Sequence, residues 1–247
     1  MPRFFVDQPL EGQVFLGGED GRHLAKSLRV RPGEEVTLCD GRGADALCKV
    51  LSIQGEGALL QVEKTSPSQG EPQTKVTVCQ CLCKGDKLET VTQKAVELGA
   101  VEIWPLESAR CVVKVDGKSA PKKVARLQKI AREAAMQSGR GVIPQVLAPA
   151  SLKQALEEAA RQGEIFFFYE RGEESLRQAL RAAGERLFVF VGPEGGFAPE
   201  EAALAQSLGA KLLTLGPRIL RTETAPLAAL SAIFYEKGDM ERRGEAT

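Results

Sequence analysis

Histidine, tryptophan and tyrosine are scarce in this sequence of 247 residues. The chain has one His, one Trp and two Tyr, and aromatic residues make up 5% of it. Because there is a single histidine, the usual Ser-His-Asp and Cys-His catalytic arrangements are excluded unless His23 itself takes part. Enzymes built on those arrangements are therefore disfavoured.

Long apolar runs and an excess of one charge are also absent. No run approaches the roughly 20 residues that span a bilayer, and the N-terminus lacks the apolar segment of a secretory signal. We therefore expect a cytoplasmic protein with no membrane partner. Lys plus Arg and Asp plus Glu each number 33, so a nucleic acid would have to meet a local basic surface instead of a global field.

Paired cysteine spacings are missing as well, although the chain has six cysteines. A zinc site would need Cys-x-x-Cys or Cys/His pairs, so no metal is expected. Cys79, Cys81 and Cys83 alternate within 76–83, which places all three on one face of a strand. We interpret them as small apolar residues of a core strand, not as ligands or disulfide partners.

The chain changes character near residue 70. Residues 1–65 contain short β-prone runs separated by Gly, Asp and Pro, which is typical of a small β-barrel or sandwich. Residues 65–73 are rich in Pro, Ser, Gly and Gln and have the composition of a linker. Further on, apolar strands alternate with amphipathic helices, which predicts a mostly parallel sheet. The predicted fold is α/β with two domains, 1–68 and 74–247.

Two helices are expected to carry basic residues, one predicted over 20–29 and one over 120–138. A solvated helix face explains such a pattern by itself, and contact with RNA phosphates is the other explanation. The basic residues concerned are Arg22, Lys26, Arg29 and nearby Arg31 in the first case, and Lys122, Arg126 and Lys129 in the second.

Two glycine-marked turns follow apolar strands near the C-terminus. One is Gly192-Pro-Glu-Gly-Gly196, and the other is Gly216-Pro-Arg-Ile-Leu-Arg-Thr-Glu-Thr-Ala225. The carboxyl ends of parallel strands form the ligand crevice of open α/β sheets. Paired glycines let a ligand approach the backbone, whereas a plain strand-to-helix turn also uses Gly and Pro. The sequence predicts either a nucleotide-like pocket or a structural turn, without a dinucleotide or P-loop motif.

In this order, the two turns closely resemble the ribosomal RNA small subunit methyltransferase E family of the SPOUT superfamily. The likeness extends to Pro2-Arg-Phe-Phe-Val6, Gln93–Gly99 and Gln137-Ser-Gly-Arg140. It implies an N-terminal PUA-like RNA-binding β-barrel and a C-terminal α/β domain with a deep trefoil knot over about 188–235. It also implies a homodimer that uses S-adenosylmethionine to methylate N3 of a uridine in 16S ribosomal RNA of the small subunit.

The resemblance also implies site residues, position by position. The expected cofactor-binding set is Phe168, Gly192, Pro193, Glu194, Gly195, Gly196, Leu215, Gly216, Ile219, Leu220, Thr222, Thr224 and Ala225. The expected RNA-binding set is Arg3, Arg22, His23, Lys26, Arg29, Arg31, Lys122, Arg126, Lys129 and Arg140.

The mechanism and the substrate each leave an alternative open. Uridine N3 must lose a proton, and the resulting anion needs donors. Arg221 or Arg218 is hypothesised to stabilise the anion and Glu194 or Glu223 to accept or orient the proton, although Glu223 could instead pair only with Arg221. The alternative functions are a SPOUT methyltransferase acting on another RNA such as transfer RNA, or a non-catalytic RNA-binding protein.

Overall fold

The structure is a computed structural model that describes residues 1–114 and 117–241, and it divides into two compact units. The first unit comprises Met1–Glu71 together with Ala135–Ile143, and the second comprises Pro72–Ala134 and the chain from Pro144 onward. Residues 242–247, the end of the predicted second domain, lie outside the described residues. The structure differs from the expected limits by grouping 135–143 with the first unit.

Five strands form the sheet of the first unit. Their order is β1-β3-β4-β5-β2, with β1 parallel to β3 and the other neighbours antiparallel. One face of the sheet buries an apolar core that includes Phe4, Leu38 and Leu60. The strands are β1 (Arg3–Phe5), β2 (Gln13–Leu16), β3 (Glu35–Cys39), β4 (Ala44–Gln54) and β5 (Gly57–Pro67). Because β5 reaches Pro67, the first residues of the predicted linker belong to a strand.

The helix predicted over 20–29 is present in a different form. It consists of α1 (Gly18–Arg22) and a π-helical segment η1 (His23–Ser27). Leu24 is fully buried, whereas Leu28 is 43% exposed. The two leucines do not share a buried face, because the backbone N–H of Leu28 bonds to the carbonyl of His23, five residues before it, and this π-helical turn shifts the positions that follow.

A parallel sheet forms the centre of the second unit, as predicted from the sequence. Its main order is β12-β10-β11-β6-β7-β8, and β9 also pairs with β7. The strands are β6 (Lys75–Cys81), β7 (Glu102–Glu107), β8 (Gln145–Val146), β9 (Ala150–Ser151), β10 (Glu164–Phe168), β11 (Arg186–Val191) and β12 (Lys211–Leu213). Two-residue strands carry no periodicity, so β8 and β9 were missed.

The central strand β6 contains the cysteines that were predicted to lie in the core. Cys79 and Cys81 are fully buried, and Cys83, just beyond the strand, is 2% exposed. The predicted burial of all three cysteines is confirmed, although Cys83 lies outside the strand that was expected to contain it.

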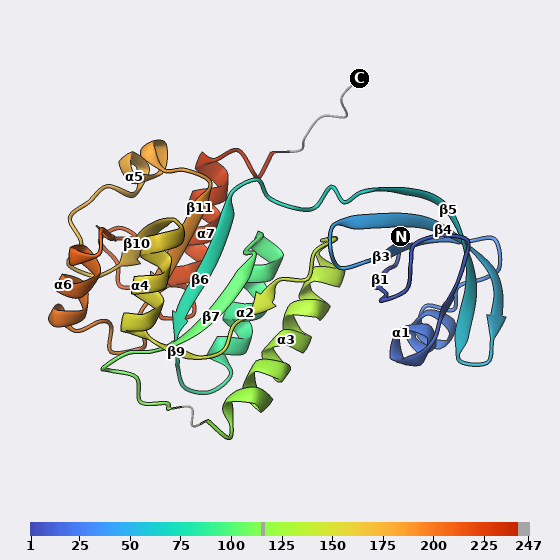
Figure 1. The fold of residues 1–247 in the computed structure, drawn as a ribbon, viewed down its shortest axis with the longest axis horizontal. Coiled ribbons are helices and arrows are strands. Elements are labelled where there is room, and N and C mark those ends of the chain that lie inside the picture. Colours follow the sequence, from blue (N-terminus) through green and yellow to red (C-terminus); the bar gives the residue numbers. More distant parts are fainter. Residues whose placement is uncertain (115–116, 242–247) are drawn as a thin grey trace. The chain divides into compact units, whose positions relative to one another are not determined.

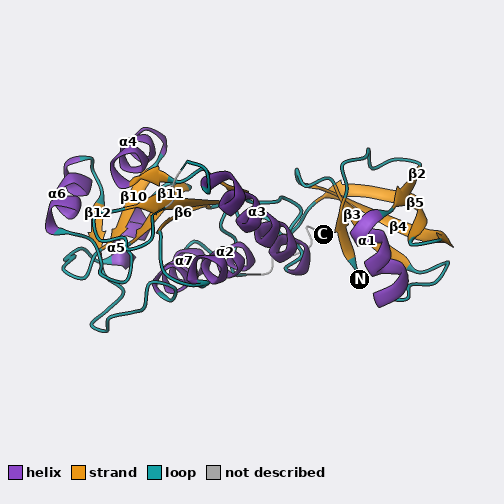
Figure 2. Ribbon diagram, turned by 90° about the horizontal axis from the view of Figure 1, so that it is seen from below, coloured by secondary structure: helices purple, strands orange, loops and turns teal. Residues whose placement is uncertain are grey.

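Helices cover both faces of the sheet. In Figure 2, α2 and α7 lie on one face and α4 on the other, and α2 packs against α7. The helices are α2 (Lys87–Leu98), α3 (Ala120–Gln137), α4 (Leu152–Gln162), α5 (Leu176–Ala182), α6 (Pro199–Ser207) and α7 (Ala225–Glu236) (Figure 1). Within the described ranges, no helix is long and apolar enough to cross a membrane.

Candidate active site

A cavity of about 670 Å³ lies in the second unit where three strands end. Phe168 ends β10, Val191 ends β11 and Leu213 ends β12, and all three line the cavity. Because these strands are parallel, the loops that follow them leave the sheet at the same edge. The volume falls within the range of about 300–1,000 Å³ that small-molecule sites occupy.

The first wall is the tight turn after β11. The backbone N–H of Gly196 donates to the carbonyl of Pro193 at 2.9 Å, and Gly196 has a φ of +67°. A Cβ on Gly192 would lie 3.2 Å from the Gly196 Cα and 3.3 Å from the Phe197 ring. A larger residue at 192 would therefore open the turn. The turn presents its backbone to the cavity.

The second wall is the loop between β12 and α7. Gly216 adopts a φ of +91°, which favours glycine. Arg218, Ile219 and Arg221 are exposed while lining the cavity, and Ile219 is 88% exposed. Apolar surface and two guanidinium groups therefore lie at the open side, a combination that suits a polar ligand with a flat apolar part.

Three charged side chains meet at the edge of the cavity. Lys87 Nζ donates to Glu194 Oε1 at 2.9 Å and lies 3.7 Å from Glu223 Oε2. Glu194 Oε1 also accepts from the backbone N–H of Lys84 at 3.0 Å. Partial burial would raise the pKa of Glu194, but the hydrogen bonds from Lys87 and from backbone N–H groups outweigh it and lower that pKa. The bond to Glu194 raises the pKa of Lys87.

Glu223 is held less firmly than Glu194. Its Oε2 is buried, and no hydrogen-bond partner for it occurs among the described residues. Arg221 lies 4.0 Å from its other oxygen, but the Arg221 side chain is 82% exposed. Such an exposed pair fixes geometry weakly. Glu223 therefore keeps an acceptor oxygen free of donors from the described chain.

A buried amide and a hydroxyl connect the two turns. Gln80 in β6 is fully buried, and its Nε2 donates to Thr222 Oγ1 at 2.9 Å. Thr222 Oγ1 donates in turn to the carbonyl of Gly192 at 2.6 Å. One side chain of a central strand thus reaches both walls of the cavity.

Known proteins similar to this chain share both of its units. Residues 70–234 match the RNA methyltransferase domain family, and residues 16–63 match the RNA methyltransferase PUA domain family. Ribosomal RNA small subunit methyltransferase E of Bacillus subtilis is 38% identical over 96% of this chain and 97% of its own length. The enzyme of that name from Mycobacterium tuberculosis is 36% identical over 93% and 90%. This chain belongs to the ribosomal RNA small subunit methyltransferase E family.

Two solved structures extend the comparison to a ligand. Ribosomal RNA small subunit methyltransferase E from Neisseria gonorrhoeae, bound to S-adenosyl methionine, superposes with a TM-score of 0.86 at 33% identity, over 95% of this chain and 97% of that one. A Legionella pneumophila protein in complex with the same cofactor gives 0.85 at 30% identity, over 94% and 96%.

The residues that the family resemblance assigned to the cofactor converge in this structure. All of them except Thr224 line the cavity, and so do the candidate catalytic residues Arg218, Arg221 and Glu194. Glu223 joins them through Lys87. The sequence analysis missed Lys87, Gln80 and the cavity residue Tyr169. Gln80 and Lys87 flank the carboxyl end of β6, so the strand-end rule that selected the two turns could also have found them.

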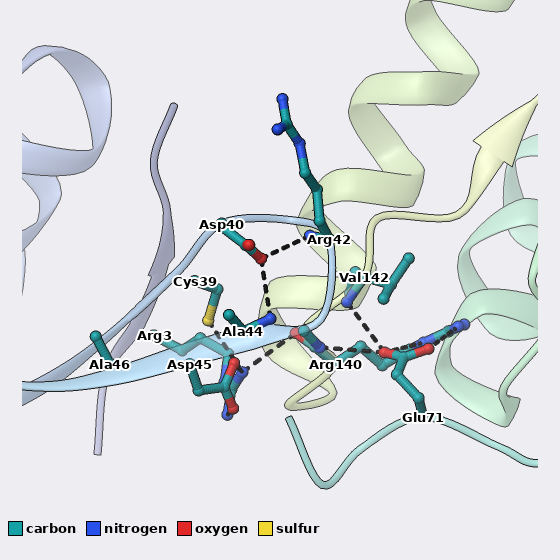
Figure 3. Close-up of polar contacts among 12 residues, drawn as sticks. Arg3, Cys39, Asp40, Arg42, Ala44, Asp45, Ala46, Glu71, Arg140 and Val142 are labelled. Atoms are coloured by element: carbon teal, nitrogen blue, oxygen red, sulfur yellow. Dashed lines mark hydrogen bonds and ion pairs between the residues drawn. The ribbon is translucent and has the colours of Figure 1, made fainter. Parts of the chain in front are cut away.

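Two expected RNA-binding residues have structural roles in the first unit instead (Figure 3). Arg140 is 2% exposed, and its guanidinium donates to both oxygens of Glu71, at 2.7 and 3.3 Å. Arg3 forms a bidentate pair with Asp45 at 2.8 and 2.9 Å. An RNA-contacting role for Arg140 is wrong for this conformation, because its guanidinium is buried and paired, and most of the Arg3 side chain is covered as well.

The other basic residues of the first unit lie at its surface. Arg22 and Lys26 are both bonded to Glu56, at 2.7 and 2.5 Å. His23 is exposed, with its ring edge against Phe4. Arg29 and Arg31 are exposed too. Glu56 offsets part of the positive charge, which leaves a smaller basic patch than the sequence predicted.

The predicted basic side of α3 is exposed in the second unit. Lys122, Arg126 and Lys129 all reach solvent. Arg126 pairs with Glu89 at 2.7 Å, and Lys129 lies 3.9 Å from Glu133. Exposed pairs of this kind are weak and exchange partners readily. Contact of these three residues with RNA phosphates stays a prediction.

Proposed function

We propose that this protein transfers a methyl group from S-adenosylmethionine to N3 of a uridine in 16S ribosomal RNA of the small subunit. The main support is the cavity between two glycine turns at the strand ends, in a chain whose structural relatives were solved with this cofactor. The match of the first unit to a PUA domain supports RNA recognition by that unit. An rRNA substrate would place the protein in the cytoplasm.

The cavity residues suit this cofactor. Phe168, Leu215 and Leu220 supply apolar walls for an adenine ring, while the backbone of the two turns supplies donors and acceptors for its edge. Lys87 and Glu194 supply charges of both signs for an amino-acid tail. When bound, S-adenosylmethionine supplies the electrophilic methyl group. The two turns would hold the cofactor and so fix the position of its methyl group, and such positioning would supply much of the rate.

The proton of N3 needs an acceptor, and the uridine anion needs donors. Arg221, or Arg218 beside it, donates to the uridine oxygens on which negative charge develops. Glu223 is the better placed acceptor, because its Oε2 has no hydrogen-bond donor among the described residues, whereas Lys84 and Lys87 both donate to Glu194 Oε1. The electron pair left on N3 would then bond to the methyl carbon while the bond between that carbon and the cofactor's sulfur breaks, so that S-adenosylhomocysteine leaves.

The same proposal includes the architecture that the resemblance implies. It consists of a closed PUA-like barrel within 1–68, a trefoil knot over about 188–235 of a domain spanning 74–247, and a homodimer. The PUA match and the superposition on the Neisseria gonorrhoeae enzyme support the two domains, and the family resemblance implies the knot and the homodimer. Light scattering of the purified protein tests the dimer, and a monomeric mass would contradict it.

Primer extension on 16S rRNA tests the substrate. Because a methyl group on N3 blocks base pairing, reverse transcriptase should stop at one uridine in wild-type rRNA and pass it in rRNA from a deletion strain. The purified protein with S-adenosylmethionine should restore the stop. An identical pattern in both strains would contradict the rRNA assignment.

Calorimetry with S-adenosylhomocysteine separates an enzyme from a non-catalytic RNA-binding protein. We expect saturable heat with one site per chain. No heat at all would contradict the cofactor assignment.

A further inference from the structure

Strand pairing places Gln80 next to the first turn. In the parallel ladder between β6 and β11, Gln80 lies opposite Val191, the residue before Gly192. Thr222 lies 142 positions from Gln80 in sequence and belongs to the second turn. The amide of Gln80 therefore joins a fixed point in the sheet to both cavity walls.

The hydrogen bonds among Gln80, Thr222 and Gly192 form a chain in which each residue donates to the next. A threonine hydroxyl has one proton to donate, and that of Thr222 goes to the carbonyl of Gly192 at 2.6 Å. Thr222 Oγ1 must then accept from Gln80 Nε2, at 2.9 Å. Gln80 Nε2 also lies 3.5 Å from the Gly192 carbonyl. The sequence of donors fixes the distance between the two turns.

The side-chain oxygen of Gln80 has no hydrogen-bond donor among the described residues, and an apolar side chain at this position would destabilise the fold less. The residue is fully buried, and its Oε1 has no partner within residues 1–114 and 117–241. A buried acceptor without a donor destabilises a fold, whereas an apolar residue of the same shape would not. Unsatisfied groups of this kind call for an explanation beyond stability. The explanation lies in the other end of the amide, where Nε2 donates to Thr222.

We infer that Gln80 and Thr222 are positioning residues that set the spacing of the two turns and thereby the affinity of the cavity for S-adenosylmethionine. The inference rests on the proposed function of the cavity. Thr222 then acts through Gly192 instead of touching the cofactor with its hydroxyl. Since the spacing matters equally before and during methyl transfer, its loss should raise KM for the cofactor and leave kcat nearly unchanged.

Three variants and a control test this inference. Thr222→Val removes the hydroxyl and keeps the shape, Thr222→Ser restores the hydroxyl, and Gln80→Met removes the amide while leaving the Thr222 hydroxyl in place. Thr92→Val is the matched control, because Thr92 is also buried and donates to a backbone carbonyl, that of Leu88 at 2.8 Å, but belongs to α2 and to neither turn. The measurements are the Kd of S-adenosylhomocysteine by calorimetry and the KM and kcat of methylation.

Thr222→Val and Gln80→Met should each raise Kd and KM about tenfold, the effect of one lost buried hydrogen bond. Thr222→Ser and Thr92→Val should bind as wild type does. Wild-type Kd in Gln80→Met would overturn the inference even if Thr222→Val does not fold, and would leave the proposed function standing. Wild-type protein that binds no S-adenosylhomocysteine would overturn both.

Discussion

At the scale of single residues, the two carboxylates beside Lys87 have different chemical uses. Glu194 is held by hydrogen bonds, whereas Glu223 has a buried oxygen without a donor among the described residues. Glu223→Gln should therefore lower kcat about 10²–10⁴-fold, the usual contribution of a general base, with little change in the KM for S-adenosylmethionine. Glu194→Gln also replaces a carboxylate beside Lys87 by an amide, and it should lower kcat far less than Glu223→Gln does. A larger loss in Glu194→Gln would assign the proton to Glu194.

The same residues show how far a sequence locates a site. Glycines at positive φ and strand-end position leave a pattern in the chain, so the turns at 192–196 and 216–225 could be predicted. Gln80 and Lys87 also flank a strand end, but their contacts could not be predicted, because the partners lie more than a hundred positions away. Arg140 was misassigned for the same reason. Its partner Glu71 is 69 positions away. An arginine is predicted to be exposed when the carboxylate that pairs with it is not known.

At the scale of elements, a single carboxylate ties three strands of the second unit together. Glu102 on β7 accepts from Thr77 on β6 at 2.6 Å and from Arg186 on β11 at 2.5 Å. Burial would raise the pKa of Glu102, but the hydrogen bonds from Thr77 and Arg186 and the charge of Arg186 lower it. The carboxylate therefore stabilises the fold above its unfolded pKa of 4.5, and that stabilisation is lost as pH falls through the lower folded pKa.

Glu102→Gln should accordingly lower the free energy of unfolding by about 1 kcal/mol at neutral pH, a value that allows for partial solvent screening. The difference from wild type should shrink once the pH falls below about 4. Urea titrations at several pH values measure it. Glu133→Gln, at a carboxylate that is 60% exposed, should change little throughout. A difference between wild type and Glu102→Gln that grows in acid would contradict the assignment.

The periodic elements of both units could be predicted because each buries one face. The helix predicted over 120–138 matches α3, and the apolar strands expected before the two glycine turns match β11 and β12. The π-helical turn at 23–27 could not be predicted, because one inserted residue shifts the register without changing composition. Strands β8 and β9 are too short to show alternation.

At the scale of the whole molecule, the chain leaves the first unit near residue 71 and returns to it for 135–143. The return segment is held by Glu71, which accepts from the Arg140 guanidinium and from the backbone N–H groups of Gly141 and Val142, both at 3.1 Å (Figure 3). In the sequence, the linker-like composition near residue 70 marks the point where the chain first passes from the first unit to the second. The second crossing falls at the end of a regular helix, α3, which gives no compositional signal.

Glu71→Gln should destabilise the first unit by about 3 kcal/mol, because it removes the carboxylate that pairs with the buried guanidinium of Arg140. The two units can be followed separately, since the single tryptophan, Trp104, and both tyrosines belong to the second. Circular dichroism in urea should therefore show an earlier first transition in the variant, ahead of the change in Trp104 emission.

The control is Glu157→Gln, which removes an exposed carboxylate from a pair with Lys153. It should shift neither signal by more than about 0.5 kcal/mol. A dichroism midpoint for Glu71→Gln equal to that of wild type would show that the segment 135–143 is held by its apolar contacts alone.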